Sequence, residues 1–152
     1  MAITPTREQF SEFVHGTREG EVVMLNLLHF ARPDGENSDR HGSEEGSSHA
    51  TGAGAYREYS DQVIKMVEAR GGKVIWTGRP EHVLIGDSEH DGWDLVALVS
   101  YPSRSAFMEM VTSPKYEEAH EHRARGLDRT VLLACEPVLN AFPTGAGGGG
   151  DA

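Results

Sequence analysis

Hydrophobic and polar positions along this chain follow two periods, one of about two residues and one of three to four residues. Alternating apolar positions predict four strands: 21–30, 73–86, 92–101 and 130–139. Helical spacing of apolar positions predicts two helical segments: 56–70 and 103–126. Pro80 breaks the second strand, and Ser113 with Pro114 restarts the second helical segment. The order β-α-β-β-α-β predicts an α+β domain, ferredoxin-like, with a four-stranded antiparallel sheet.

The two ends of the chain and one internal segment differ from this pattern. Thr4 and the proline after it resemble a helix start, so residues 1–20 are expected to form an extra N-terminal helix packed on the domain. Within the domain at 21–140, residues 31–54 contain five glycines and almost no apolar side chains, which predicts a mobile loop near the mouth of a pocket. The glycine-rich residues 141–152 are expected to be a flexible tail.

The predicted strands are apolar on both of their faces. In 21–30, for example, Val22 and Met24 belong to one alternating set, and Val23 and Leu25 belong to the other. A ferredoxin-like sheet carries its own helices on one face only, so the second face needs another cover. A second copy of the chain would provide that cover, and we therefore expect an obligate homodimer.

Composition limits the kinds of molecule that the protein is expected to bind and the cellular compartment in which it is expected. The chain has 152 residues, enough for one domain with a core, and a formal net charge of −10, which disfavours nucleic acid and anionic membrane surfaces as partners. No window approaches the length of a membrane span or a signal peptide, so the cytoplasm is the expected location. The single cysteine, Cys135, lies in an apolar run and is expected to be a buried, inert thiol.

The stretch AHEHRARGLD, residues 119–128, contains the most chemically suggestive side chains. At about 100° per residue, His120 and Arg123 share one helix face with Tyr116, whereas His122 lies on the flank. His120 and His122 point about 200° apart and cannot chelate one ion, so no metal site is expected here. An arginine on an inward face needs a partner, and that partner is either an internal carboxylate or a bound anion.

Other polar residues lie at positions where they could contact a ligand. Asn26 interrupts an apolar strand, and a buried amide needs hydrogen-bond partners. It forms a hydrogen bond either to the backbone at an irregularity of the sheet or to a ligand. Tyr101 and Arg104 stand at a strand-to-helix junction beside Ser103, a predicted helix cap. His41 and His49 lie among carboxylates in the loop, but their spacing matches no metal-ligand signature.

Several segments together resemble a known family: VVMLNLLHF, AYREY, GGKVIWTG, VLIG, WDLVALVSYPSRSAFMEMVTSPKY and HRARGL. The chain resembles a bacterial family of small proteins in the dimeric α+β barrel superfamily that is named only as a domain of unknown function. The resemblance implies a ferredoxin-like protomer whose sheet packs against that of a twin. Carried over by position, the recurrent polar residues of the family are Asn26, Tyr56, Tyr59, Tyr101, Ser103, Arg104, Tyr116, His122 and Arg123. Relatives in the superfamily include cofactor-free monooxygenases, muconolactone isomerases and haem-dependent chlorite dismutases, so the fold alone does not specify a reaction.

Two functions fit these residues. The first is binding of a small organic ligand, such as an organic acid, in an apolar cavity of the barrel, with or without cofactor-free oxygenase or isomerase chemistry. The second is a non-catalytic dimeric structural or interaction module. The expected ligand-binding residues for the first are Asn26, Tyr56, Tyr101, Arg104, Tyr116, His120 and Arg123. No cofactor is expected, because no histidine stands in a position that suggests an axial haem ligand.

Overall fold

The first strand of the chain lies in the middle of the sheet. The computed structural model describes residues 4–32 and 52–142. Its elements are α1 (Arg7–Val14), β1 (Val22–Phe30), α2 (Gly52–Ala69), β2 (Lys73–Gly78), the 3-10 helix η3 (Ser88–His90), β3 (Leu95–Tyr101), α3 (Arg104–Val111), α4 (Pro114–Gly126) and β4 (Leu127–Cys135). All strand pairs are antiparallel and the order across the sheet is β2-β3-β1-β4. This order and the β-α-β-β-α-β sequence confirm the predicted ferredoxin-like α+β fold.

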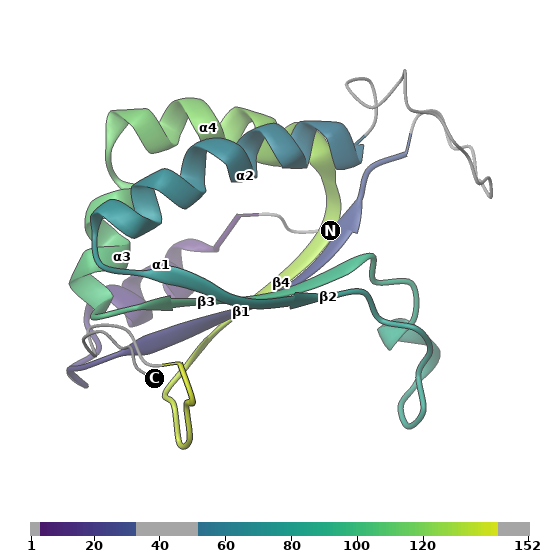
Figure 1. Ribbon diagram of the computed structural model, residues 1–152, viewed down its shortest axis with the longest axis horizontal. Helices are drawn as coiled ribbons and strands as arrows, with labels where there is room; N and C mark the ends of the chain where they lie inside the picture. Colours follow the sequence, from purple (N-terminus) through teal and green to yellow (C-terminus); the bar gives the residue numbers. More distant parts are fainter. Residues whose placement is uncertain (1–3, 33–51, 143–152) are drawn as a thin grey trace.

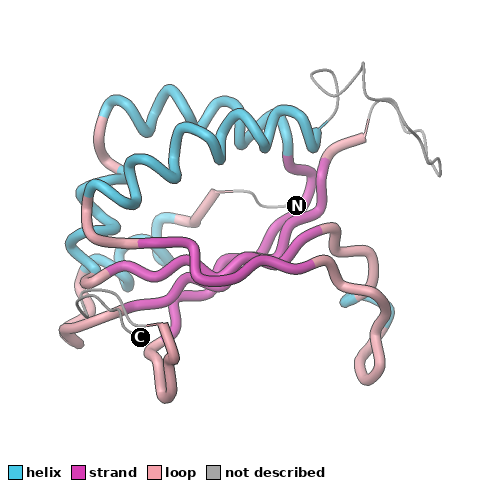
Figure 2. The backbone as a smooth tube through the Cα atoms, viewed as in Figure 1, coloured by secondary structure: helices cyan, strands magenta, loops and turns pink. Residues whose placement is uncertain are grey.

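The helices cover one face of the sheet. In Figures 1 and 2, α2 and α4 lie next to each other above the strands, and α1 and α3 lie at one end on the same side. The buried face of α2 follows three- and four-residue steps, as helical periodicity requires. The main core cluster between the layers comprises Val22, Met24, Tyr59, Val63, Met66, Val67, Tyr101, Met110 and Ala119. This cluster brings two tyrosines into the apolar interior.

The N-terminal helix begins later than the sequence suggested. Thr6, not Thr4, is the N-cap: its hydroxyl accepts a hydrogen bond from the Gln9 backbone N–H at 3.0 Å, and Gln9 Oε1 accepts one from the Thr6 N–H at 2.9 Å. This reciprocal capping box satisfies two helix donors, which outweighs the preference of a proline for the first helical position. The ring of Phe13 then packs edge-on against Phe107 of α3, 5.4 Å away.

The second strand is less than half as long as predicted. β2 ends at Gly78, which pairs with Val96, and only Leu95 of β3 lies beyond that pair, so β3 does not extend far enough to pair with the run 81–86. Within this run Leu84 and Ile85 are 84% and 93% exposed. The prediction of a strand at 81–86 from its apolar residues was therefore wrong, because a strand needs a hydrogen-bonding partner strand as well as an apolar pattern.

The last strand begins and ends earlier than its apolar pattern suggested. β4 covers Leu127–Cys135, and its final pair joins Cys135 to Val23, the second residue of β1. Val138 and Leu139 lie beyond that pairing and are exposed. Cys135 is half-buried and not fully buried as expected, because it stands at the end of an edge strand.

The loop prediction for 31–54 is partly wrong. Residues from Gly52 onward already belong to α2, whose first N–H donates to Ala31 O at 3.1 Å. The rest of that prediction, with His41 and His49, lies outside the described residues, as does the tail from 143. In 4–32 and 52–142, no helix combines the length and the apolar character needed to cross a membrane.

The face of the sheet away from the helices is covered at Val23 and Ser100, but no helix of the described chain covers the rest of it. Because β-strand side chains alternate, Leu25 and its cross-strand partners Leu98 and Leu133 point to this face when Met24 points to the core. Leu133 is 51% exposed and Trp76, which pairs with Leu98, is 54% exposed. The β2–β3 connection and the segment after β4 project on this same side in Figure 1. The sheet therefore presents apolar side chains on both faces, as the sequence predicted.

Candidate functional site

A close backbone junction positions the helix faces that carry the candidate residues. Ala31, just after β1, donates its N–H to Gly126 O at 2.9 Å and accepts the N–H of Gly52 at 3.1 Å. A Cβ atom added at Gly126 would lie 2.7 Å from Gly52 O and 2.9 Å from the Tyr56 backbone nitrogen. Only glycines permit this approach, so the start of α2 and the end of α4 are fixed side by side.

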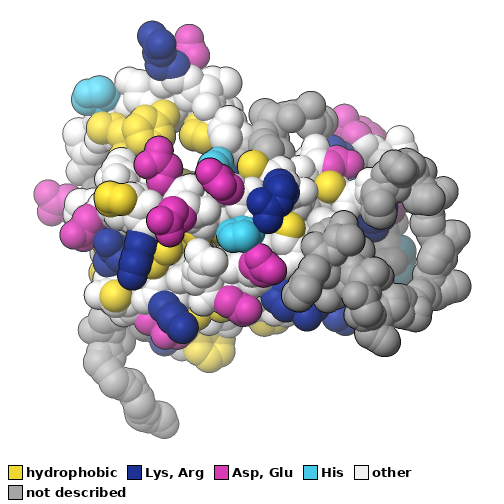
Figure 3. All heavy atoms as spheres, turned by 90° about the horizontal axis from the view of Figure 1, so that it is seen from above, with side chains coloured by type: hydrophobic (Ala, Val, Ile, Leu, Met, Phe, Trp, Pro, Cys, Tyr) yellow, Lys and Arg dark blue, Asp and Glu magenta, His cyan; other side chains and the backbone are white. Residues whose placement is uncertain are grey.

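Helix α4 turns one face inward and one outward, as its sequence predicted. Ala119 is fully buried and Arg123 is 7% exposed. On the flank, His122 Nδ1 lies 3.2 Å from Glu58 Oε1 and 2.8 Å from Arg125 Nη2. Figure 3 shows acidic and basic side chains interspersed over the outer surface of the helix layer. The outer half of α4 is therefore a solvated charged surface, and the inward half carries the candidate chemistry.

Aromatic side chains from α2 and α4 meet between the two helices. The Tyr59 and Tyr116 hydroxyls form a hydrogen bond of 3.0 Å, and their rings are 6.0 Å apart in an edge-on arrangement. Tyr56 packs against Tyr59 at 5.1 Å, and the Arg123 guanidinium lies 6.0 Å from the Tyr59 ring centre. His120 lies 5.9 Å from Tyr116. We call Tyr56, Tyr59, Tyr116, His120 and Arg123 the tyrosine cluster.

Burial keeps the phenols of this region neutral. Desolvation raises the pKa of Tyr56 to about 12, although the charge of Arg123 partly opposes the effect. Burial also raises the pKa of Tyr59, with the neighbouring Tyr116 and Tyr56 adding to the shift. The hydroxyls therefore remain hydrogen-bond donors at neutral pH.

His120 supplies an acceptor that the described protein does not use. Its Nδ1 is buried and has no hydrogen-bond partner among the described residues. Burial lowers the pKa of the imidazole from its usual value, and the positive charge of Arg123 lowers it further. A neutral imidazole at neutral pH can accept a proton or a hydrogen bond from a bound hydroxyl group.

Asn26 lies on the helix-facing side of the sheet but is used locally. Its Nδ2 donates to Met24 O and to Ala97 O, both at 3.3 Å. Ala97 is its direct partner on β3. These contacts agree with the role of hydrogen bonding to the backbone of the sheet. The Oδ1 atom of Asn26 can accept a hydrogen bond from a further donor.

Tyr101 and Arg104 have different surroundings. Tyr101 is buried in the core, where its ring packs edge-on against Phe107 at 5.1 Å, and burial raises its pKa. Arg104 instead donates to Phe13 O at 2.9 Å and covers the Phe13 ring, so it contacts the N-terminal helix and not the tyrosine cluster. Ser103 caps α3 as predicted, accepting the Ala106 N–H at 3.1 Å.

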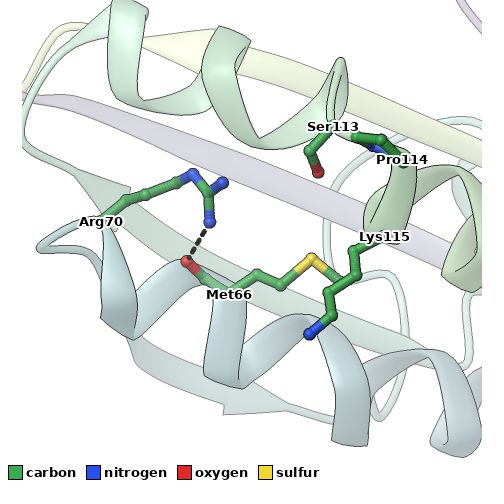
Figure 4. Close-up of a pocket in the computed structure, with 5 residues that line it drawn as sticks. All are labelled: Met66, Arg70, Ser113, Pro114 and Lys115. Carbon is green, nitrogen blue, oxygen red and sulfur yellow. Dashed lines mark hydrogen bonds between the residues drawn. The ribbon is translucent and has the colours of Figure 1, made fainter.

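A pocket lies at the far ends of the same two helices. It has a volume of about 290 Å³ and is lined by Met66, Arg70, Ser113, Pro114 and Lys115 (Figure 4). Met66 also belongs to the core cluster that contains Tyr59. The sequence analysis missed this pocket, because Arg70 and Lys115 are far apart in the chain and both fit ordinary helix surfaces.

Metal-ligating residues do not gather in the part of the chain that is described. No group of three or more His, Cys, Asp or Glu side chains there could hold a metal ion. The chemistry available in the tyrosine cluster is that of phenol donors, a neutral imidazole and a guanidinium. Such a set can bind an anionic organic molecule and move a proton to or from it.

The chain is similar to a known protein family and to solved structures with this fold. Residues 46–136 match the family described as "Domain of unknown function (DUF1330)". The chain is also 37% identical to RPA0582, a protein of unknown function from Rhodopseudomonas palustris, with a TM-score of 0.75 over 91% of this chain and 98% of that one. This chain belongs to the DUF1330 family. The sequence resemblance to a domain of unknown function is thereby confirmed.

Two further structures extend the comparison. A methylated form of RPA0582 is 35% identical, with a TM-score of 0.74 over 93% of this chain and 98% of that one. At3g17210 from Arabidopsis thaliana is 15% identical, with a TM-score of 0.50 over 80% of this chain and 99% of that one, and this likeness concerns the fold alone. Comparison with curated proteins gave no match.

The DUF1330 match includes the whole tyrosine cluster but not Asn26, which precedes residue 46. Tyr59 was absent from the expected ligand-binding set, although it is central to the cluster. The signal for it was its position three residues after Tyr56, which places both rings on neighbouring parts of one helix face.

Proposed function

We propose that this DUF1330 protein binds a small organic acid at the tyrosine cluster. The observation behind the proposal is the buried, unpartnered Nδ1 of His120 beside the guanidinium of Arg123 and the hydrogen-bonded Tyr59–Tyr116 pair. A buried ring nitrogen without a hydrogen bond costs free energy, and a ligand hydroxyl, which can donate or accept, would remove that cost.

The cluster offers complementary groups for such a ligand. Arg123 has five N–H donors, so a carboxylate can form a bidentate pair with it while the guanidinium retains contacts within the protein. The rings of Tyr56 and Tyr59 provide aromatic surface for an organic body. Cofactor-free oxygenation or isomerisation is the enzymatic form of this proposal, with His120 as the group that accepts a proton from the ligand.

An Arg123→Lys variant tests the binding proposal. We expect the wild-type protein to gain thermal stability from some members of a panel of aromatic and aliphatic carboxylic acids, because a ligand that binds only the folded state stabilises it. The variant should lose this gain, because lysine cannot form the planar bidentate pair. Differential scanning fluorimetry across the panel measures both effects.

Arg125→Lys is the matched control, because Arg125 lies on the outer face of the same helix and is exposed. It should respond to acids as the wild type does. If the wild type shows no acid-dependent shift and Arg123→Lys is destabilised without any ligand, the arginine serves an internal contact and the binding proposal fails. The alternative function, a non-catalytic dimeric module, would then be preferred.

We also propose that the helix-free face of the sheet packs against a second copy of the chain. Leu25, Leu98, Trp76 and Leu133 make this face apolar, and the projecting segments that flank it have exposed apolar side chains of their own: Leu84, Ile85, Val138 and Leu139. Exposed apolar area of this extent is typical of an interface between subunits. A self-complementary sheet face suits a two-fold symmetric dimer.

Light scattering at micromolar concentration is expected to give about twice the chain mass of 16.6 kDa. Leu133→Glu should shift the protein toward monomer or make it insoluble, because it places a charge on the apolar face. Ile64→Glu is the control: Ile64 is also a partly exposed apolar residue, but it lies on α2, in the helix layer. A stable, soluble wild-type monomer would rule out the dimer.

A further inference from the structure

The pocket between the last turn of α2 and the start of α4 has the composition of an anion site. Two of its five lining residues, Arg70 and Lys115, are cations, and no lining residue is acidic. In Figure 4, the Arg70 guanidinium lies on one side of the Met66 side chain, and the Lys115 side chain passes the tip of Met66 with its ammonium group on the other side. In a chain with a formal net charge of −10, two cations on one small pocket are a local exception.

Contacts within the protein use only part of the Arg70 guanidinium. Its Nη1 donates to Met66 O at 3.2 Å, which holds the side chain over the end of α2. Its Nε is buried and has no hydrogen bond among the described residues. The nearest carboxylate, Glu109 Oε1, is 3.7 Å from Nε, and the Glu109 side chain is 72% exposed. Because the Glu109 carboxylate is largely in water, its pairing with Arg70 is weak and screened by salt, so a ligand anion can displace it.

The rest of the pocket favours an anion attached to a small organic body. Met66 and Pro114 supply apolar surface, and Ser113 is occupied as a helix cap, donating to Met110 O at 2.7 Å and accepting the Tyr116 N–H. The positive end of the α4 dipole faces the same space, because residues 113–115 begin that helix and line the pocket. The volume of about 290 Å³ suits a small metabolite.

We propose that this pocket binds the phosphate group of a small phosphate monoester, with Arg70 and Lys115 as its two cationic contacts. A phosphate monoester carries close to two negative charges at neutral pH, which matches two cations better than a single carboxylate does. The site shares no lining residue with the tyrosine cluster, which lies farther along the same two helices. It therefore stands or fails separately from the proposed acid-binding function.

Titration of the wild-type protein with glycerol 3-phosphate, followed by two-dimensional ¹H–¹⁵N NMR at constant ionic strength, tests the site. The expected result is saturable shifts at Ser113 and Lys115 and at the Arg70 Nε–H. Lys115→Gln should weaken binding about tenfold, because it removes one charge-assisted contact. Lys115 is exposed and has no role in the core, so this variant should fold normally. Arg70→Gln should weaken binding by at least as much.

Lys65→Gln is the matched control, because Lys65 is an exposed lysine on α2 that does not line the pocket. It should bind glycerol 3-phosphate as the wild type does, and so should Arg123→Lys. Equal shifts with sodium acetate at the same ionic strength would overturn the proposal, because they would indicate only general anion attraction. Shifts that fail to saturate, or that spare Ser113, Lys115 and Arg70, would overturn it as well.

Discussion

Gly126→Ala is expected to lower the free energy of unfolding by about 2 to 3 kcal/mol, the range of a packing clash that forces backbone to move. The new methyl group would lie 2.7 Å from Gly52 O and 2.9 Å from the Tyr56 nitrogen, and neither backbone atom can move aside as a flexible side chain would. Both α2 and the Ala31 hydrogen bonds would have to shift. Urea denaturation monitored by circular dichroism measures the change.

The sign of the stability change on Gly126→Ala distinguishes a close backbone contact at this position from an open one. Alanine has a higher helix propensity than glycine by about 0.5–1 kcal/mol, so without the close contact the same substitution should stabilise α4. Gly52→Ala should behave like Gly126→Ala, because its Cβ would meet the Ala31 backbone and Gly126 O. Ala53→Gly, at an exposed position of α2, is the control and should cost only about 1 kcal/mol. A Gly126→Ala protein more stable than the wild type would contradict the described junction.

Alkaline titration is expected to leave Tyr56, Tyr59 and Tyr101 of the folded protein un-ionised at about pH 11. Burial raises the pKa of Tyr56 to about 12 and raises the pKa values of Tyr59 and Tyr101 above the usual value of 10. In the unfolded chain all four tyrosines should ionise near pH 10. Absorbance at the phenolate band, recorded against pH with and without denaturant, distinguishes the two states.

The same shifts have a consequence for stability. Each phenol binds its proton more tightly in the folded state, so its contribution to stability is fully present below pH 10. That contribution decreases as the pH rises above 10 toward the folded-state pKa, which is about 12 for Tyr56. Tyr56→Phe should therefore make the free energy of unfolding less dependent on pH in this range. If all four tyrosines of the folded protein ionised together near pH 10, the cluster would be open to water and this account would be wrong.

Local patterns in the sequence determined the elements and the faces of the helices. Ser103 and Ser113 cap α3 and α4 as predicted, because a cap is a contact between residues three apart. Arg123 faces inward on α4 and His122 lies on its flank, because a helix repeats every 3.6 residues wherever it is placed. The ferredoxin-like order followed from the succession of strands and helices. These features depend on few residues close together in the chain.

Features that depend on pairing across the chain needed the tertiary structure. Residues 81–86 and Val138 with Leu139 have strand-like patterns, but they remain outside the sheet because no partner strand extends far enough to pair with them. Arg104 contacts Phe13 of α1, and the sequence did not predict this contact because the two residues are far apart in the chain.

Part of the tyrosine cluster could be predicted from the sequence, and part of it depends on tertiary contacts. Helical spacing put Tyr116, His120 and Arg123 on one face, and this could be predicted from the chain alone. The hydrogen bond from Tyr59 to Tyr116 joins residues 57 positions apart, and the pocket of Arg70 and Lys115 joins the ends of two helices. Gly52 and Gly126 allow α2 and α4 to approach closely at one end, and a periodicity along one helix contains no information on the distance to another.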